Sequence, residues 1–174
     1  SYLEPTHYLE VEILRRLDSA VHRHIHVIRS PINPRMRMMI RDGQITPAHF
    51  HWNKMEDIIF REGDGEFCMK LWNADLETEA LIPDTHVFLK VDGIVTEFEP
   101  GKTYKIKKGQ SVCYTPYIYH TFWAEGGTCL VGEVSMVNDD TADNRFLEPV
   151  GRFPAIEEDV PAKVLLCNEY PLFD

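Results

Sequence analysis

The sequence predicts an all-β fold of the barrel or jelly-roll type. From Met36 onward, short apolar runs of about four to eight residues alternate with turn dipeptides. These turns space the strands about 8 to 12 residues apart, and they include Asp42-Gly43, Asp92-Gly93 and Gly126-Gly127. Short strands at this spacing are typical of antiparallel barrels and jelly rolls.

One segment near the N-terminus, residues 8–21, has a helical period instead. Its apolar residues recur at a spacing that places them on one helical face: Leu9, Ile13, Leu17 and Val21. We expect a short N-terminal helix here, followed by a linker that contains two prolines, Pro31 and Pro34. The chain then divides into an N-terminal helical segment with its linker, 1–34, and a barrel domain with a C-terminal wrap, 35–174.

The strands of the barrel are expected where apolar residues alternate with polar ones or form a short continuous run. The Asp92-Gly93 dipeptide predicts a tight hairpin between two of them. Residues 74–86 are polar and acidic and are expected to form a loop, and the proline-rich tail from Asn138 is expected to be irregular. The expected strands are 37–40, 45–51, 56–61, 66–72, 87–91, 94–98, 104–107, 111–114, 120–124 and 128–137.

Length and composition fit one globular domain. The 174 residues suffice to bury a core, and 44% apolar with 26% charged residues is an ordinary balance. The net charge of −10 argues against nucleic acid and against an anionic membrane surface, because both attract basic faces. No apolar run approaches the roughly 20 residues of a membrane-spanning helix, and no signal peptide opens the chain. We therefore expect a cytoplasmic protein.

The cysteines are far apart in the sequence and form no Cys-x-x-Cys pair. Most have apolar neighbours, such as Phe67, Met69 and Leu130. Thiols in such surroundings are typically buried, and they stay reduced in a reducing compartment. We expect free thiols rather than disulfides at Cys68, Cys113, Cys129 and Cys167.

The functional argument begins at residues 49–56, His-Phe-His-Trp-Asn-Lys-Met-Glu. His49 and His51 are two positions apart, so their side chains share one side of a strand. Glu56 follows after enough chain to turn back, and His120 lies downstream of Pro116. Three imidazoles and one carboxylate suit Mn, Fe, Co, Ni or Zn better than Ca or Mg. The alternative is that these are ordinary polar residues on an exposed hairpin.

The spacing of these residues resembles the two sequence motifs of the cupin family. Residues 43–63 match the first motif in full, as Gly-x5-His-x-His-x4-Glu-x6-Gly. Residues 109–120 match the second more loosely, as Gly-x6-Pro-x3-His, without the usual glycine after the proline. The resemblance implies a double-stranded β-helix of the jelly-roll type. It also implies one divalent metal bound by His49, His51, Glu56 and His120, which would leave two positions of a six-coordinate ion open.

Three longer stretches resemble the D-lyxose isomerases of the cupin superfamily. They begin at His49 (HFHWNKMEDII), Leu130 (LVGEVSMVNDD) and Asp143 (DNRFLEPVGRF), and the similarity extends over residues 35–174. The resemblance implies a homodimeric, usually Mn-dependent aldose–ketose isomerase. Such an enzyme interconverts D-lyxose and D-xylulose, and often D-mannose and D-fructose. Residues 1–34 do not resemble the longer N-terminal region of that family.

Aldose–ketose isomerisation moves a proton between C1 and C2 through an enediol. It needs a carboxylate to carry the proton and an electrophile to stabilise the negative oxygens. By resemblance, Glu148 in Phe-Leu-Glu-Pro is the candidate base. Lys54 is a second catalytic candidate, because its ammonium would donate to a sugar oxygen or to the enediolate. The alternatives are a surface acid before a proline for Glu148 and a solvated lysine in a turn for Lys54.

Four further residues are candidates for sugar binding: Asp143, Arg145, Arg152 and Trp123. The three charged ones would bind hydroxyl groups or anchor the tail through ion pairs, and both interpretations stay open. Trp123 would stack on a sugar ring or pack at the rim of the core. Glu133 lies in the middle of a predicted strand among apolar residues. If it faces the barrel interior, it needs a polar partner or a substrate.

Two other functions remain as alternatives to the sugar isomerase. An Fe(II)-dependent cupin dioxygenase would use the same three histidines and one glutamate. A non-catalytic sugar-binding cupin would use the pocket without turnover. For the isomerase we expect Mn2+, with Zn, Co, Ni or Fe as alternatives, and a small sugar as the partner in a homodimer. We expect neither nucleic acid nor membrane as a partner.

Overall fold

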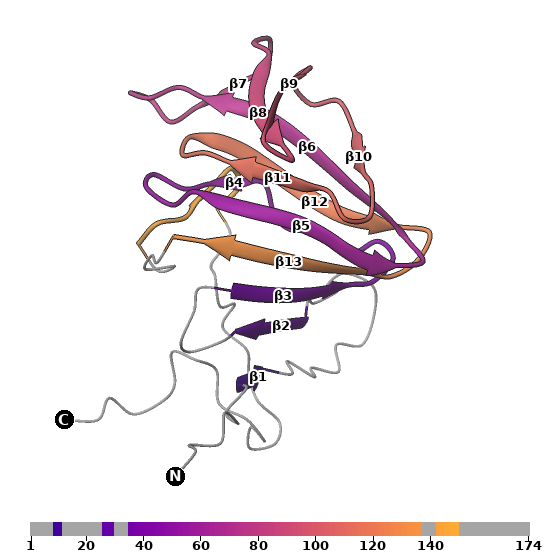
Figure 1. Ribbon diagram of the computed structural model, residues 1–174. Coiled ribbons are helices and arrows are strands. Elements are labelled where there is room, and N and C mark those ends of the chain that lie inside the picture. The colour runs from indigo at the N-terminus through magenta and orange to yellow at the C-terminus, as the bar shows by residue number, and fades with distance from the viewer. Residues whose placement is uncertain (1–8, 12–25, 30–34, 137–141, 150–174) are drawn as a thin grey trace, which may run out of the picture.

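Two antiparallel sheets make up the part of the chain that the computed structural model describes, residues 9–11, 26–29, 35–136 and 142–149 (Figure 1). The larger sheet has eight strands and the smaller has six, counting β7, which pairs with β6 at its side. In order across the larger sheet, the strands are β1 (Leu9–Val11), β2 (His26–Arg29), β3 (Arg35–Ile40), β13 (Cys129–Ser135), β5 (Glu56–Gly63), β11 (Ser111–Tyr114), β8 (Val87–Val91) and β9 (Ile94–Phe98). The smaller sheet runs β10 (Tyr104–Ile106), β6 (Glu66–Ala74), β12 (Ile118–Glu125), β4 (His49–Phe50) and β14 (Arg145–Phe146), with β7 (Leu81–Ile82) beside β6.

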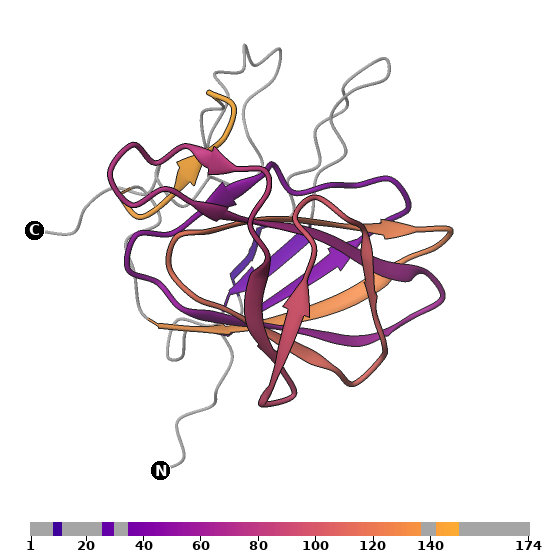
Figure 2. The same ribbon diagram turned by 90° about the horizontal axis from the view of Figure 1, so that it is seen from above.

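The two sheets curl around a common interior, as the view from above shows (Figure 2). The predicted all-β, cupin-type jelly roll is therefore confirmed. No helix occurs among the described residues, so none of them forms a helix that could span a membrane.

The predicted N-terminal helix is wrong where the structure describes it. Leu9–Val11 forms strand β1, which pairs antiparallel with β2 in the register Leu9↔Arg29. Strand β2 in turn pairs with β3, so this segment extends the larger sheet. The helical period of the sequence is only a local preference, and pairing with a neighbouring strand overrides it. The remainder of the predicted helix, residues 8 and 12–21, lies outside the described residues. The division of the chain at residue 34 stays a prediction.

The strand predicted over residues 45–51 is reduced to two residues, His49–Phe50. Pro47 has no backbone N–H to donate to a ladder, so a continuous strand cannot run through it. Ile45 forms only an isolated bridge with Trp123. The paired strand β12 is longer than predicted because it pairs with β6 along its whole length.

Tight turns join several neighbouring strands. Asp92 and Gly93 have φ angles of 50° and 81°, as expected for the two central residues of a type I′ hairpin, so the predicted β8–β9 hairpin is confirmed. The turns at Gly65 and Gly127 touch each other. A Cβ on Gly65 would lie 2.6 Å from the carbonyl carbon of Gly127, which leaves room only for glycine.

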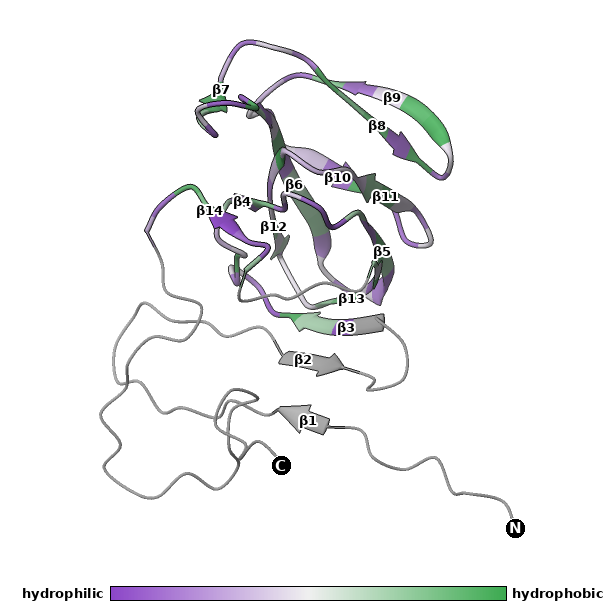
Figure 3. Ribbon diagram, turned by 90° about the vertical axis from the view of Figure 1, so that its left-hand side faces the viewer, coloured by the Kyte–Doolittle hydropathy of each residue, from purple (hydrophilic) through white to green (hydrophobic). Residues whose placement is uncertain are grey.

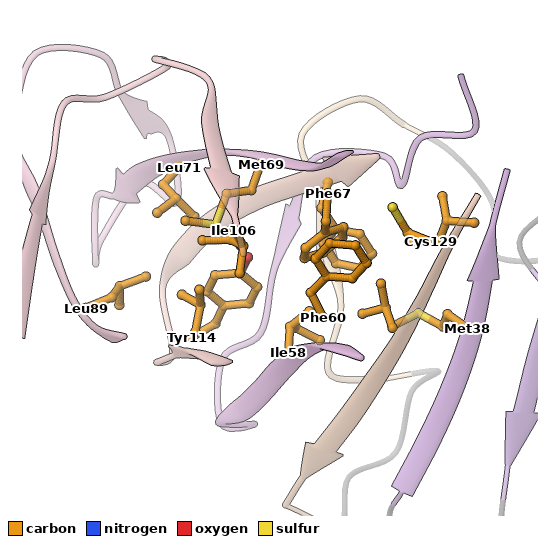
Figure 4. Packing of buried hydrophobic residues seen from close by; sticks show 14 of the residues in the cluster. Met38, Ile58, Phe60, Phe67, Met69, Leu71, Leu89, Ile106, Tyr114 and Cys129 are labelled. Atoms are coloured by element: carbon orange, nitrogen blue, oxygen red, sulfur yellow. Dashed lines mark hydrogen bonds between the residues drawn. The ribbon is translucent and has the colours of Figure 1, made fainter. Parts of the chain in front are cut away.

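The main core lies between the sheets and is built from side chains of both (Figure 4). Phe67 on β6 is fully buried, with its ring centroid 5.7 Å from that of Phe60 and 5.5 Å from that of Phe122. Figure 3 shows that apolar residues also reach the tip of the β8–β9 hairpin, where Ile94 and Val95 are exposed.

A second, smaller apolar cluster gathers Phe50, Ala74 and Tyr119, with Trp52, Trp72, Leu81 and Tyr117 packed against it. Successive residues of β12 point to opposite faces of their sheet. Phe122 thus joins the main core and Tyr119 the second cluster, and His120, between them in sequence, faces the barrel interior. This alternation decides which residues can reach the candidate site.

Candidate metal centre

Four side chains from three strands and one turn converge inside the barrel: His49, His51, Glu56 and His120. One nitrogen or oxygen atom from each of them lies within 4.8 Å of the others. Strand pairing explains the convergence, because His120 on β12 lies directly opposite His49 on β4. Glu56 begins β5 in the facing sheet. The sequence placed these four together by spacing, and the structure brings them together.

The three imidazole rings are packed tightly against one another. The ring centroid of His120 lies 4.4 Å from that of His49 and 5.8 Å from that of His51. Tyr114 stacks on the other side of His120, at 4.5 Å and 19° between planes. His51, Glu56 and His120 are almost completely buried.

Each imidazole is held at Nδ1 by a backbone carbonyl oxygen. Nδ1 of His49 lies 2.8 Å from the oxygen of Pro47, Nδ1 of His51 lies 2.5 Å from that of Asp143, and Nδ1 of His120 lies 2.9 Å from that of Ile118. A carbonyl oxygen only accepts hydrogen bonds, so these contacts assign the proton to Nδ1. In the neutral form of each ring, Nε2 then carries a free lone pair.

In these tautomers, Nε2 of His51 and Nε2 of His120 bring their lone pairs close to the carboxylate of Glu56. Nε2 of His51 and Nε2 of His120 are buried and make no hydrogen bond. The Glu56 oxygens lie 3.0 Å from Nε2 of His120 and 3.6 Å from Nε2 of His51. Buried acceptors that face one another need a cation to stabilise them. The residues therefore fit a divalent metal ion.

The protonation states also suit a metal. Burial, together with the nearby His120 and His51, holds the pKa of His49 well below its usual range. Burial alone would raise the pKa of Glu56, but opposing interactions, among them the charge of the Lys54 ammonium 2.6 Å away, outweigh it, so that this pKa is well below its usual range. Near neutral pH the group thus presents a neutral imidazole at His49 and a carboxylate at Glu56, which are the forms that bind metals.

Lys54 is buried beside this cluster rather than solvated in a turn. Its Nζ lies 2.6 Å from Oε2 of Glu56 and 2.9 Å from Oε1 of Glu133. Burial would lower the pKa of Lys54, but the two carboxylates outweigh it and raise this pKa, so the side chain stays an ammonium. Glu133 does face the interior, and Lys54 is the polar partner that it requires.

Burial and the charge of Glu56 raise the pKa of Glu133, although Lys54 opposes them. A buried carboxyl with a raised pKa beside a possible metal site is a candidate for acid–base work. Sequence reasoning gave Glu133 little weight. The available indication was a lone charged residue within an otherwise apolar strand.

Asp143 lies among the metal-site residues as an anchor. Its Oδ1 accepts hydrogen bonds from the backbone N–H groups of Trp52 (2.9 Å) and Asn53 (3.0 Å), and its Oδ2 accepts one from that of Lys54 (2.9 Å). Asp143 is also buried. Of the two interpretations left open by the sequence, these contacts favour anchoring over sugar binding.

The remaining sequence-predicted residues lie farther from the cluster. Arg145 donates to Oε2 of Glu79 at 3.1 Å, an ion-pair contact. Trp123 points to the face of its strand opposite His120, where the ammonium of Lys70 lies 5.9 Å from the ring, so the structure does not bring it to the metal centre. Glu148 is exposed, close in sequence to Phe146, whose ring lies 5.5 Å from that of His49. Arg152 lies outside the described residues.

Comparisons with known proteins agree with the site. The sequence profile of the D-lyxose isomerase family matches residues 34–170. A D-lyxose/D-mannose isomerase from Escherichia coli O157:H7 is 47% identical over 138 residues, which are 78% of this chain and 60% of that protein. One from Serratia proteamaculans is 49% identical over 138 residues, which are 78% of this chain and 59% of that protein. The chain thus spans about three fifths of the length of these relatives.

Among solved structures, the L-ribose isomerase of Cellulomonas parahominis with L-psicose aligns at a TM-score of 0.47 and 17% identity. The alignment covers 66% of this chain and 58% of that one. A likeness of this size adds no weight to the assignment.

Proposed function

Because this chain belongs to the D-lyxose isomerase family, we propose that it is a metal-dependent aldose–ketose isomerase. It interconverts D-lyxose and D-xylulose, and also D-mannose and D-fructose, through an enediol. The observation that carries the proposal is the set of ligand atoms within 4.8 Å of one another, with acceptor lone pairs turned inward. The names of the two curated relatives support the choice of sugars.

We propose Mn2+ as the metal, held by His49, His51, Glu56 and His120, although Zn, Co, Ni and Fe suit the same donor set. When bound, a divalent ion supplies Lewis-acid polarisation of the two neighbouring sugar oxygens O1 and O2. The backbone carbonyls at Nδ1 keep the three imidazoles in the tautomer that such an ion requires.

The proton transfer is the task of a protein carboxylate. In the aldose-to-ketose direction, the C2–H bond breaks, the carboxylate takes the proton, and the electron pair forms the enediolate. The same proton then returns to C1, while a hydroxyl proton moves from O2 to O1, so that atoms and charge balance. Lys54, held as an ammonium, would donate a hydrogen bond to the developing negative oxygen.

Two carboxylates are candidates for the proton carrier. Glu148 is supported by family resemblance and by its position on the segment that pairs with β4. Glu133 is supported by its burial and by its contact with Lys54, which also holds the metal-site residue Glu56. We propose that one of these two carries the proton, and that Lys54 assists it. Arg145 and Arg152 remain proposals for sugar binding.

The test uses protein stripped with a chelator and reloaded separately with Mn, Co, Ni, Fe or Zn. D-lyxose, D-mannose and D-fructose are supplied under anaerobic conditions, and the products are separated chromatographically. We expect turnover with Mn and no requirement for O2. Absence of turnover with every metal and sugar would overturn the proposal. The Fe(II) dioxygenase is the second candidate, since the same donor set serves it, and O2-dependent consumption of substrate would favour it.

Two matched substitutions identify the proton carrier. Glu133→Gln and Glu148→Gln each remove one candidate base. The substitution that removes the true proton carrier should lower kcat about 10²- to 10⁴-fold while sugar binding persists. Glu77→Gln, an exposed glutamate on another loop, is the control. Full turnover in both variants would exclude both carboxylates. Sugar binding by a wild-type protein that shows no turnover would favour the non-catalytic alternative.

We also propose a homodimer that works in the cytoplasm. The cysteines that the structure describes, Cys68, Cys113 and Cys129, are free thiols, which supports a reducing compartment. Light scattering that gives twice the mass of the chain supports the dimer, and a value of one chain mass contradicts it.

A further inference from the structure

The loop between β6 and β7, residues 75–80, has a shape fixed by its own hydrogen bonds. Oδ1 of Asp75 accepts from the backbone N–H groups of Glu77 (3.1 Å) and Thr78 (2.7 Å) and from the Thr78 hydroxyl (2.8 Å). The N–H of Glu79 donates to the carbonyl oxygen of Asp75 at 2.9 Å. Glu79 is thereby held at a φ of 61°, a left-handed conformation that few glutamates adopt.

From this position Glu79 contacts three other segments of the chain. Its Oε1 accepts a hydrogen bond from Nε1 of Trp52 at 2.7 Å, and its Oε2 accepts one from Nε of Arg145 at 3.1 Å. Its carbonyl oxygen accepts a hydrogen bond from the hydroxyl of Tyr119 at 3.0 Å. We call these three contacts the Glu79 bridge.

Each partner in the Glu79 bridge lies next to a group of the metal centre. Trp52 directly follows His51, and Tyr119 directly precedes His120. Arg145 lies two residues after Asp143, whose carbonyl oxygen holds Nδ1 of His51. One residue thus links the two histidine-bearing segments to the segment that orients one of them.

We propose that Glu79 is a positioning residue for the metal centre, acting through Trp52, Tyr119 and Arg145 on His51 and His120. The proposal rests on the metal centre of the proposed function. The three contacts of the Glu79 bridge are with neighbours of the metal-site side chains, so Glu79 sets the separation of the ligands rather than the chemistry. Removing the carboxylate breaks the contacts with Trp52 and Arg145 and leaves the backbone contact with Tyr119, so that the His51 turn and the 143–146 segment shift relative to β12, and metal affinity falls.

A purely structural role of Glu79 would affect global unfolding rather than the metal centre. The side chains of Glu79 and Arg145 are 34% and 42% exposed, and ion pairs this exposed contribute little to the stability of a protein. The bridge therefore affects the metal centre more than it affects global unfolding. Measuring both quantities on the same variants separates the two roles.

The experiment compares Glu79→Gly and Glu79→Gln with wild type. Glycine removes the carboxylate but tolerates the positive φ, so it introduces no backbone strain. Glutamine keeps an oxygen that can accept from Trp52 but loses the charge opposite Arg145. Glu77→Gln, on the same loop and equally a loss of one carboxylate, is the matched control. Each protein is stripped of metal and titrated with Co2+ in competition with a chelator, and its visible absorption spectrum is followed.

We expect Glu79→Gly to bind Co2+ about tenfold more weakly than wild type, at the lower end of the effect of groups behind metal ligands. Its spectrum should also change, while the Tm of its metal-free form stays within about 4 °C of wild type. Glu79→Gln should fall between the two, and Glu77→Gln should match wild type. If Glu79→Gly does not fold, Glu79→Gln decides by the same readouts.

Wild-type affinity and spectrum in the Glu79 variants would overturn this inference. A fall in metal-free Tm with unchanged Co2+ binding would overturn it as well, because it shows a structural role only. If wild type itself fails to bind Co2+, the proposed metal centre fails, and that result is distinct from a failure of the Glu79 bridge.

Discussion

The carbonyl oxygen of Asp143 lies 2.5 Å from Nδ1 of His51, a residue 92 positions earlier in the chain. The carboxylate of Asp143 meanwhile accepts hydrogen bonds from the three consecutive backbone N–H groups that follow His51. One residue therefore sets both the tautomer of a metal-site histidine and the conformation of the turn after it. The segment 142–149 is part of the site, although it contributes no ligand atom.

Replacing Asp143 by asparagine should lower the free energy of unfolding by about 1–3 kcal/mol. The amide has one acceptor oxygen, so its NH2 group would face the backbone N–H of Lys54 and leave a buried donor unpaired. Urea denaturation of the metal-free protein measures the change. Asp84→Asn, at an exposed aspartate, is the control and should show no change. Equal stability of the two variants would contradict the anchoring role.

Replacing Lys54 by methionine should cost about 3–5 kcal/mol of unfolding free energy, because it leaves the buried Glu56 and Glu133 without their shared counter-charge. The double variant Lys54→Met with Glu133→Gln should recover part of the loss. Urea denaturation of the single and double variants gives the coupling between the two residues. Lys108→Met, which breaks an exposed ion pair with Glu62, should have no measurable effect. Additive losses at Lys54 and Glu133 would contradict the pairing.

Replacing Phe67 by alanine should destabilise the barrel by about 3–5 kcal/mol, because the cavity lies between Phe60 and Phe122 where neighbouring side chains cannot collapse fully. Phe88→Ala removes the same number of atoms from a side chain that is 60% exposed, so its cost should be small. Thermal and urea unfolding of both variants measure the difference. A similar loss in both would mean that burial at Phe67 is not what stabilises the barrel.

The sequence predicted the features that depend on local pattern. Alternating apolar residues and Asp-Gly turns located most barrel strands, because each strand face is read from residues two positions apart. His49, His51 and Glu56 were found by spacing within one stretch. His120 was found by its resemblance to the second cupin motif, and the structure shows that it lies on the strand that pairs with β4.

Features that depend on pairing between distant segments were missed. Leu9–Val11 lies in a segment with a helical period, yet pairing with β2 makes these residues a strand. The burial of Lys54 follows from Glu133, 79 residues later, and no local pattern joins the two. Trp123 was a candidate for sugar stacking by residue type alone, and the parity of β12 places it on the opposite face from His120.

Cys68 and Cys129 should react slowly with thiol reagents in the folded protein. Burial raises the pKa of both thiols to about 11, and the Glu125 carboxylate adds to the effect at Cys68. Because the thiolate is the reactive form, iodoacetamide at pH 8 should label both at least about 100-fold more slowly in the folded than in the unfolded protein. Mass spectrometry of pulse-labelled peptides measures each site. Cys113 is half-buried and is the internal control, expected to react faster than the other two. Because the pKa of each thiol is higher in the folded than in the unfolded protein, the protonated thiols favour the folded state. This contribution to stability is fully present below pH 9 and is lost as the pH rises through about 11. Labelling of Cys68 or Cys129 as fast as Cys113 would contradict their burial in the barrel.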